Sequence, residues 1–438
     1  MRFNQTALIV VLLAWPLPGV GAEPAASAPG AINQLTPTQI AEGWINLFDG
    51  ETTFGWQPTS DANWQAKDGE IQVSEGAEGF LMTTTEFADY ELHVEFKAPA
   101  ATNSGVFLRT PLEPTDPTKD CIELNIAPQD NPFPTGSLVG RHRWPAETLK
   151  IPFTSEGESG DWYSFDVSVN RNLILVNPGG GDSYSNGSAT PLRGRIGLQF
   201  REGPVAFRNI RLKPLGLKPM LNGQDLAGWN TDKVEVAKYE VVPQRGRESF
   251  ATNEATKEPT SPVAKDSRPL PAESELHVTS GRGQLETEAS YADFIMQLDC
   301  FVDGDGLNSG VFFRSIPRDF ANGYEAQIQN AVKDNDLTKP VDAGTGAIYR
   351  RTTARRVVSK DREWFTMTLI PTGAHIAVWV NGYQVTDWTD DRKPDSNPRK
   401  GLRTEAGTIS LQAHDPTTNL RFRNLRIAEF PKATHIAE

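Results

Sequence analysis

Two seven-residue stretches, Asn103-Ser-Gly-Val-Phe-Leu-Arg109 and Asn308-Ser-Gly-Val-Phe-Phe-Arg314, differ at a single position. The motifs around the first stretch recur in the same order around the second. Ile122–Ile126 corresponds to Tyr324–Ile328, and each copy closes on one pentad, Phe207-Arg-Asn-Ile-Arg211 or Phe422-Arg-Asn-Leu-Arg426. So many matches in one order indicate an internal duplication, which predicts two domains of the same fold.

The length and composition are those of a soluble globular protein. The chain has 438 residues, 38% of them hydrophobic, so each copy is long enough to bury its own core. The formal net charge is -13, and no basic cluster offsets it. An acidic surface repels phosphates and anionic lipids, which argues against nucleic acid or a membrane surface as partner. The sequence leaves the oligomeric state open.

The N-terminus has the pattern of a secretory signal peptide. Arg2 supplies a positive charge, an apolar run follows from Ala7 to Trp15, and small residues stand at Val20-Gly-Ala22. The apolar run is too short to span a bilayer. We therefore expect cleavage after Ala22 and a secreted or periplasmic protein without membrane insertion. Residues 23–40, rich in Ala, Pro and Ser at their start, are predicted to form a flexible lead-in.

The duplicated motifs place copy one at residues 41–214 and copy two at residues 219–430. The very short linker between the copies predicts that the two domains pack against each other. Trp56 and Asn103 are 47 residues apart, whereas their counterparts Trp229 and Asn308 are 79 apart. The extra residues fall within about 232–272, a polar stretch that predicts a disordered surface loop, with a lid over a site as the alternative.

Alternating apolar and polar residues predict strands rather than helices. Apolar residues recur at every second position over Tyr90–Phe96, and copy two repeats the alternation over Phe294–Cys300. Asn381-Gly382 separates two apolar runs and favours a hairpin with a type I′ turn. Many short strands separated by Gly and Pro indicate a sandwich or jelly roll. We therefore expect an all-β chain of two tandem jelly-roll β-sandwich domains.

The chain has two cysteines, Cys121 and Cys300, at positions that do not correspond between the copies. Cys300 stands where copy one has Phe96, at an inward-facing strand position. This placement predicts a buried free thiol at Cys300, with a disulfide to Cys121 as the alternative.

The signature strand and the next strand are predicted to share a polar face. Alternation places Asn103, Phe107 and Arg109 on one face of the first strand, and Glu123 and Asn125 on one face of the second. Copy two repeats this division with Asn308, Phe312, Arg314, Glu325, Gln327 and Gln329. Amide groups both donate and accept hydrogen bonds, so such a face suits a carbohydrate. The alternative is a solvated outer face with an Arg–Glu pair.

Histidines are few, and no cofactor is expected. His142 and His414 have no cysteine partners, so neither belongs to a recognisable metal-binding motif. On the residues alone, a structural hydrogen-bonding role suits either histidine at least as well as a catalytic one. No glycine-rich phosphate loop is present.

Together these motifs resemble the 3-keto-disaccharide hydrolase family. The resemblance rests on the signature stretch, the closing pentad and three motifs of copy two, Tyr324-Glu-x-Gln-Ile328, Thr345-Gly-Ala-Ile-Tyr349 and Gly407-x-Ile-x-Leu-Gln412. It covers nearly all of the chain after the signal, once per copy. It implies a concanavalin A-like jelly roll whose two antiparallel sheets present a concave surface to a carbohydrate.

The resemblance also implies cleavage of 3-keto-glycosides or 3-keto-disaccharides, either by loss of the C1 substituent after proton abstraction at C2 or by direct hydrolysis. It makes Glu325 and His414 the base and the acid, in either order, with Arg314 as the stabiliser. The implied substrate-binding residues are Asn308, Gln327, Tyr349, Gln412 and Asp415 in copy two, and Arg109, Glu123, Asn125 and Gln199 in copy one.

The main site is expected in copy two, which keeps more of the family motifs. Copy one has Gln199-Phe-Arg-Glu202 where copy two has Gln412-Ala-His-Asp415, so it lacks the histidine. A non-catalytic, lectin-like carbohydrate-binding tandem module is the alternative, because this fold also serves in lectins. A structural or interaction protein is a further alternative.

Overall fold

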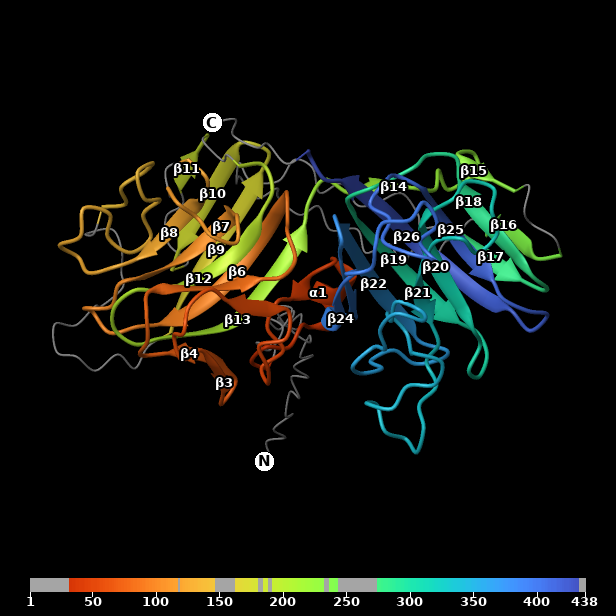
Figure 1. Cartoon of the computed structure of the whole chain (residues 1–438), viewed down its shortest axis with the longest axis horizontal. Helices are drawn as coiled ribbons and strands as arrows, with labels where there is room; N and C mark the ends of the chain where they lie inside the picture. Colours follow the sequence, from red (N-terminus) through yellow and green to blue (C-terminus); the bar gives the residue numbers. More distant parts are fainter. Residues whose placement is uncertain are drawn as a thin grey trace, which may run out of the picture.

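The computed structural model describes residues 31–116, 119–145, 162–179, 184–187, 191–231, 236–242 and 274–432. Almost all of the regular secondary structure in this part is antiparallel strand, in four sheets, one of eight and one of five strands in each copy. Figure 1 shows two β-sandwiches side by side, copy one in orange to green and copy two in green to blue. The predicted all-β fold of two tandem β-sandwich domains is confirmed.

In copy one the larger sheet has the order β11-β10-β9-β6-β13-β4-β3, with β1 paired to β13. Its strands are β1 (Ile45–Asn46), β3 (Gln65–Lys67), β4 (Glu70–Val73), β6 (Tyr90–Lys97), β9 (Tyr163–Asn170), β10 (Leu173–Pro178), β11 (Tyr184–Asn186) and β13 (Val205–Pro214). The smaller sheet has the order β2-β5-β12-β7-β8. Its strands are β2 (Trp56–Pro58), β5 (Gly79–Thr83), β7 (Ser104–Thr110), β8 (Ile122–Ile126) and β12 (Arg195–Phe200).

Copy two repeats this plan. Its larger sheet has the order β16-β17-β26-β19-β22-β23-β24, with β14 paired to β26. The strands are β14 (Lys218–Pro219), β16 (Lys238–Val242), β17 (Glu275–Thr279), β19 (Phe294–Val302), β22 (Trp364–Thr372), β23 (His375–Val380), β24 (Tyr383–Thr389) and β26 (Asn419–Glu429). The smaller sheet has the order β15-β18-β25-β20-β21. Its strands are β15 (Trp229–Asn230), β18 (Gly283–Thr287), β20 (Ser309–Ser315), β21 (Tyr324–Ile328) and β25 (Thr408–Ala413).

The predicted alternation holds in both copies, but the burial of the outer face differs between them. In β6 every second residue is buried and the others are half-buried, as expected for a strand with one face on the core. In β19 almost every residue is buried, because Ile295 and Gln297 on its outer face contact copy one. Duplicated strands therefore differ in burial where one of them also forms the domain interface.

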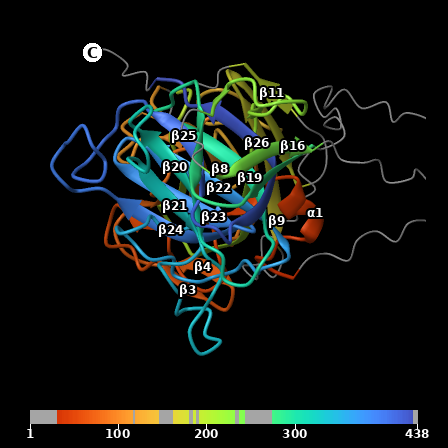
Figure 2. The same cartoon turned by 90° about the vertical axis from the view of Figure 1, so that its right-hand side faces the viewer.

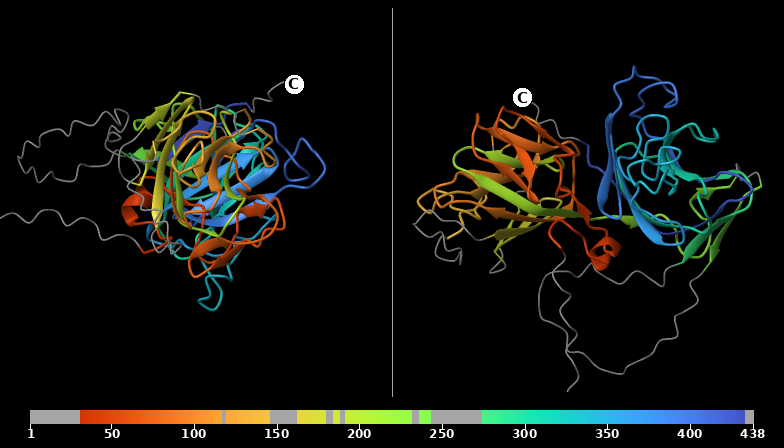
Figure 3. Two further views of the ribbon diagram at one scale, coloured as in Figure 1. Left: turned by 90° about the vertical axis from the view of Figure 1, so that its left-hand side faces the viewer. Right: turned by 90° about the horizontal axis from the view of Figure 1, so that it is seen from below.

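The two domains pack together through the opening segment of copy one. The short helix α1 (Pro37–Ala41) begins at a capping box formed by Thr36 and Gln39. Behind it, Gly43 O accepts from Gln297 Nε2 at 2.8 Å, and Asn46 O accepts from Trp379 Nε1 at 2.9 Å. Figure 3 shows α1 at the junction of the two sandwiches in its right-hand view.

Apolar packing and ion pairs complete this interface. Four side chains of copy two join the copy-one core cluster, and these are Ile295, Ile370, Ala377 and Trp379. Arg355 pairs with Asp49 at 2.8 Å, and Arg193 pairs with Asp293 at 2.9 Å. Part of the outer face of the larger sheet of copy two is therefore covered by copy one.

Asn381 and Gly382 both have positive φ, 50° and 75°, which confirms the type I′ turn. Cys121 and Cys300 are both buried free thiols, so the alternative of a disulfide between them is wrong. Part of the predicted inserted loop forms β16, which pairs with β17 as β3 pairs with β4. The rest of that loop, and the predicted signal peptide, lie outside the described residues.

Gly382 gives a test of the interface. At φ +75°, a Cβ on this residue would lie 3.1 Å from the Trp44 carbonyl oxygen and closer still to Leu35 Cδ1 of copy one. We expect Gly382→Ala to cost about 2–4 kcal/mol of unfolding free energy in urea, from backbone strain and overpacking. The control Gly373→Ala, at φ +54° with no atom within 4 Å, should cost only the strain of about 1 kcal/mol. Equal losses in the two variants would contradict the interface.

Candidate active site

The candidate site lies on the outward face of the smaller sheet of copy two. Side chains at alternate positions of its strands belong to the apolar core, among them Leu285, Val311, Phe313, Ala326 and Leu411. The intervening side chains form a second face, which we call the polar face; its members are Gln284, Glu286, Phe312, Glu325, Gln327, Ser410 and Gln412. In the sheet register, Glu286 pairs with Ser410, Ser410 with Phe312, and Phe312 with Glu325, so these four form one row across the sheet.

The polar face is largely covered by a connection that sequence reasoning missed. Residues 316–323, between β20 and β21, fold onto it, and the Ala321 N–H donates to Gln284 Oε1 at 2.9 Å. The Arg318 N–H donates to the carboxylate of Glu286 at 3.1 Å. Gln284 and Glu286 are consequently 1% and 2% exposed although they point away from the core. Their alternation around the apolar Leu285 is a signal that could have placed them on this face.

Glu325 has the electrostatic properties of a proton-transfer group. It is 5% exposed, and its Oε2 accepts from Arg399 Nη2 at 3.2 Å. Burial raises the pKa of Glu325 to about 7, against the opposing charges of Arg399 and His414. Near neutral pH the carboxyl group is therefore about half ionised, so it can both accept and donate a proton.

Arg399, the partner of Glu325, comes from a segment that the sequence did not single out. It lies in the connection between β24 and β25, residues 390–407, and its guanidinium stands 5.4 Å from the centroid of the Phe312 ring. Figure 2 shows this connection in blue, projecting to the left from copy two. Copy one has only residues 187–194 between β11 and β12, and no counterpart of Arg399 in sequence.

Several buried polar atoms on this face have no hydrogen-bond partner among the described residues. They are Gln284 Nε2, Gln327 Oε1, Ser410 Oγ and Gln412 Oε1. Buried polar groups are almost always hydrogen-bonded, so such a cluster points to groups supplied by water or by a ligand. Three acceptor-capable oxygens and one amide donor together suit a ligand that carries hydroxyl groups.

The other predicted residues of copy two lie around this face. His414 is exposed at the end of β25, and its Nδ1 contacts Asp415 Oδ2 at 2.9 Å. Its charge lowers the pKa of Glu325, although no hydrogen bond joins the two side chains. Asn308 donates to Asp342 Oδ2 at 2.7 Å, and Gln327 donates to the same oxygen at 3.2 Å. Tyr349 is half-buried, and its N–H donates to the Glu325 carbonyl oxygen.

Arg314 and Arg109 do not lie on the polar faces, and the prediction that they do is wrong. Both have positive φ, 47° and 49°, next to a shift in strand register, and this bulge breaks the alternation. The guanidinium of Arg314 is fully buried; it donates to the carbonyls of Ala292, Gly373 and Arg403 and pairs with Asp293 at 3.0 Å. Both arginines therefore join the two sheets of their sandwich instead of reaching a ligand.

The comparison with known families decides the identity of the chain. The family model of the 3-keto-alpha-glucoside-1,2-lyase-like domain matches it twice, over residues 43–213 and residues 216–428. The chain belongs to this family. No curated protein matches the chain significantly.

Solved structures resemble one lyase-like domain at a time. A candidate glycosyl hydrolase from Parabacteroides distasonis shares 21% identity at a TM-score of 0.36, covering 42% of this chain and 100% of its own. A second candidate glycosyl hydrolase from that organism shares 28% identity at 0.30, covering 35% of this chain and 86% of its own. The carbohydrate-binding module CBM66 from Bacillus subtilis shares 10% identity at a TM-score of 0.27, covering 36% of this chain and 95% of its own.

The two lyase-like domains, copy one and copy two, differ on the outward face of the smaller sheet. In the first domain the register pairs Met82 with Gly197, Gly197 with Phe107, and Phe107 with Glu123. Apolar Met82 and Phe80 thus replace Glu286 and Gln284 of the second domain, and the Phe80 and Phe107 rings pack edge to face at 4.7 Å. Asn125 and Gln199 keep their predicted positions, each with an unpartnered buried oxygen.

Glu123 is the counterpart of Glu325, and burial also raises its pKa to about 7. Within the described residues no hydrogen bond or ion pair reaches the Glu123 carboxyl group, whereas Glu325 is held by Arg399. The first lyase-like domain therefore has the carboxyl group without the positioned arginine and without a histidine at the equivalent of His414.

Neither a metal-binding cluster nor a membrane-spanning helix is present in the described part of the chain. No group of three or more His, Cys, Asp or Glu side chains there could hold a metal ion. In the same ranges, no helix is long and apolar enough to cross a membrane.

Glu123 gives a prediction about pH and stability. The carboxyl group ionises near pH 4.5 when the protein is unfolded but only near pH 7 when it is folded. The stability that the neutral form contributes is therefore fully present below pH 4.5 and is lost as the pH rises through 7. We expect Glu123→Gln to leave the unfolding free energy unchanged below pH 4.5 and to raise it by up to ~3 kcal/mol above pH 7. Urea unfolding at the two pH values measures the difference; a gain independent of pH would contradict the raised pKa.

Proposed function

We propose that this protein cleaves 3-keto-glycosides, including 3-keto-disaccharides, at the polar face of copy two. The observation that carries the proposal is Glu325, a buried carboxyl group whose pKa is raised to about 7 among unpartnered amide and hydroxyl groups. Perturbed pKa values of this kind concentrate at catalytic sites. Membership of a family described as 3-keto-alpha-glucoside-1,2-lyase-like supplies the substrate class.

The proposed reaction begins with proton abstraction at C2. The C3 ketone acidifies this C–H bond, and the ionised Glu325 accepts the proton. The electron pair of the C–H bond forms a C1=C2 double bond conjugated with the ketone, and the C1–O bond to the leaving group breaks. The leaving oxygen takes up a proton and departs as an alcohol. Water can then add across the double bond, which gives hydrolysis overall.

The surrounding groups have roles that follow from their positions. Arg399 carries a positive charge beside Glu325 and is the cation available to stabilise negative charge on the substrate oxygen, the role that the family resemblance implied for Arg314. His414, exposed and oriented by Asp415, is the candidate acid for the leaving oxygen. Gln327 and Gln412 offer unpartnered carbonyl oxygens to sugar hydroxyl groups.

A lectin-like function is the second candidate, and one observation favours it. The equivalent face of copy one keeps the amides Asn125 and Gln199 but has neither the arginine nor the histidine. Such a face can bind a sugar without a positioned acid–base pair. We therefore propose that copy two cleaves and that copy one at most binds. The signal-like pattern of residues 1–22 supports the further proposal that the protein acts after export.

Turnover in heavy water tests the proposed function. The purified protein is incubated with a 3-keto-glycoside in D2O, and the sugar is followed by NMR. Release of the aglycone with deuterium at C2 is the expected result, because elimination removes the C2 proton. Release without deuterium would contradict elimination and favour direct hydrolysis. Saturable binding without release would favour the lectin-like function.

A further inference from the structure

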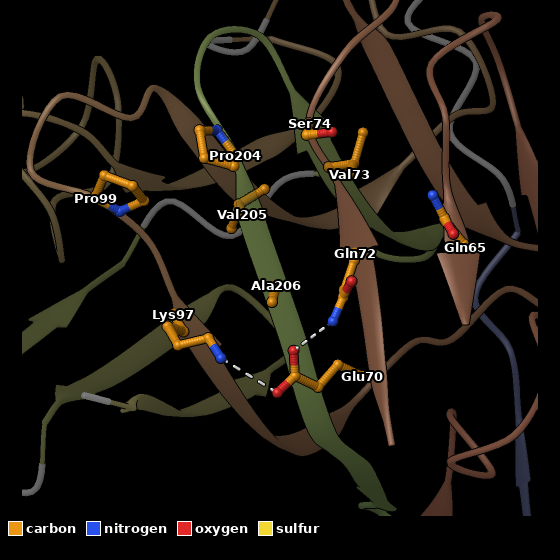
Figure 4. Close-up of a pocket in the computed structure, with 10 residues that line it drawn as sticks. All are labelled: Gln65, Glu70, Gln72, Val73, Ser74, Lys97, Pro99, Pro204, Val205 and Ala206. Carbon is orange, nitrogen blue, oxygen red and sulfur yellow. Dashed lines mark hydrogen bonds and ion pairs between the residues drawn. The ribbon is translucent and has the colours of Figure 1, made fainter. Parts of the chain in front are cut away.

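A cavity of about 250 Å³ lies on the outer face of the larger sheet of copy one, the sheet opposite the one that carries Glu123. It is bounded by β3, β4, the end of β6 and the start of β13. Figure 4 shows its lining residues, which are Gln65, Glu70, Gln72, Val73, Ser74, Lys97, Pro99, Pro204, Val205 and Ala206. At this volume it can hold one small ligand rather than a chain of several rings.

Comparison with copy two explains why the cavity exists. The register pairs Phe207 with Ile71 in copy one and Phe422 with Leu276 in copy two, so Ala206 corresponds to Arg421. The Arg421 side chain fills the equivalent space. Its guanidinium stacks on the Phe301 ring at 4.0 Å and pairs with Glu275 at 3.5 Å. A methyl group replaces this large side chain in copy one, and the space is left open.

The polar groups of the cavity are already oriented. Glu70 accepts from Lys97 Nζ at 3.3 Å and from Gln72 Nε2 at 2.8 Å. The Lys97 ammonium also lies 4.8 Å from the centroid of the Trp162 ring, which limits its movement. The single negative charge of the lining therefore stands beside its single positive charge, and the cavity has no net charge to attract an ion.

We propose that this cavity binds a single neutral sugar unit, at a site separate from the proposed catalytic face. Gln65, Gln72 and Ser74 supply amide and hydroxyl groups that both donate and accept hydrogen bonds. The side chains of Pro99 and Pro204 line the rest and can contact the C–H face of a sugar ring. A phosphate would meet Glu70 and an ammonium ligand would meet Lys97, so a neutral polyhydroxylated ligand suits this lining best. The proposal does not depend on cleavage by copy two.

Calorimetric titration with D-glucose and methyl α-D-glucopyranoside, which lack the ketone, tests this site. Ala206→Arg should fill the cavity as Arg421 does in copy two, with Glu70 as the ion-pair partner, and should remove one binding site from the stoichiometry. Gln72→Leu keeps the side-chain size and loses one polar group, and should weaken binding at this site about tenfold. Turnover of a 3-keto-glycoside should stay within about twofold of wild type in both variants, because the cavity lies on the other sheet of the other domain.

The matched control is Ala227→Arg, the same substitution at an exposed position of copy two, which should bind both sugars like the wild type. Equal stoichiometry and affinity in wild type and Ala206→Arg would overturn the proposal, as would the absence of sugar binding to the wild type. If the wild type binds sugar but shows no turnover, the proposed function fails while this site stands.

Discussion

Replacing Glu325 with glutamine is expected to lower kcat for a 3-keto-glycoside by about 10²–10⁴-fold, the usual contribution of a positioned general base. Glutamine has nearly the same shape and can still accept a hydrogen bond from Arg399, so the sheet should remain intact. It cannot take a proton from C2. Steady-state kinetics of the intact protein measure the loss, and a single cooperative unfolding transition shows that the variant is folded.

Glu123→Gln is the matched control, because Glu123 occupies the equivalent position of copy one and has the same raised pKa. Its kcat should remain within about twofold of wild type, since that face lacks Arg399 and His414. Equal losses in the two variants would mean that both copies cleave, and a fully active Glu325→Gln would eliminate Glu325 as the base.

The pH dependence provides a second readout of the same group. The ionised form is the base, so kcat/KM should rise with pH up to the Glu325 pKa of about 7. Because the Arg399 charge lowers this pKa, Arg399→Met should move the rising limb to higher pH as well as reduce its plateau. If the plateau of kcat/KM falls while the rising limb of the pH profile stays at the same pH, Arg399 acts in substrate binding alone.

Replacing Arg314 with methionine is expected to destabilise copy two by about 3–5 kcal/mol, the usual cost of removing one partner from a buried ion pair. The substitution leaves Asp293 with Arg193 but without Arg314, and it takes hydrogen bonds from the carbonyls of Ala292, Gly373 and Arg403. Urea unfolding measures the effect. At temperatures where the variant is folded, its turnover should be close to that of the wild type.

Arg362→Met is the matched control, because Arg362 pairs with Asp305 in the same domain but both side chains are largely exposed. Exposed pairs of this kind contribute about 0–1 kcal/mol. If Arg314→Met were as stable as this control and yet inactive, the prediction made from the sequence, that Arg314 acts in catalysis, would be right after all.

The sequence alone was sufficient for the duplication, the all-β fold and the two faces of the signature strands. Each of these depends on local regularities: an ordered repeat of motifs, a period of two along a strand, and an Asn-Gly turn that needs positive φ. Alternation correctly placed Glu325 and Gln327 opposite Tyr324 and Ala326, because a regular strand has no freedom to do otherwise.

Only the tertiary structure decided the composition of the candidate site. Arg314 was misplaced because a bulge turns its side chain between the sheets, and a period of two does not reveal a bulge. Arg399 was missed because it is 74 residues from Glu325 and lies in a connection without a repeating pattern. The raised pKa of Glu325 likewise depends on its burial under distant segments. Local sequence determines which way a strand residue points, whereas charge pairing and burial depend on contacts between residues far apart in the chain.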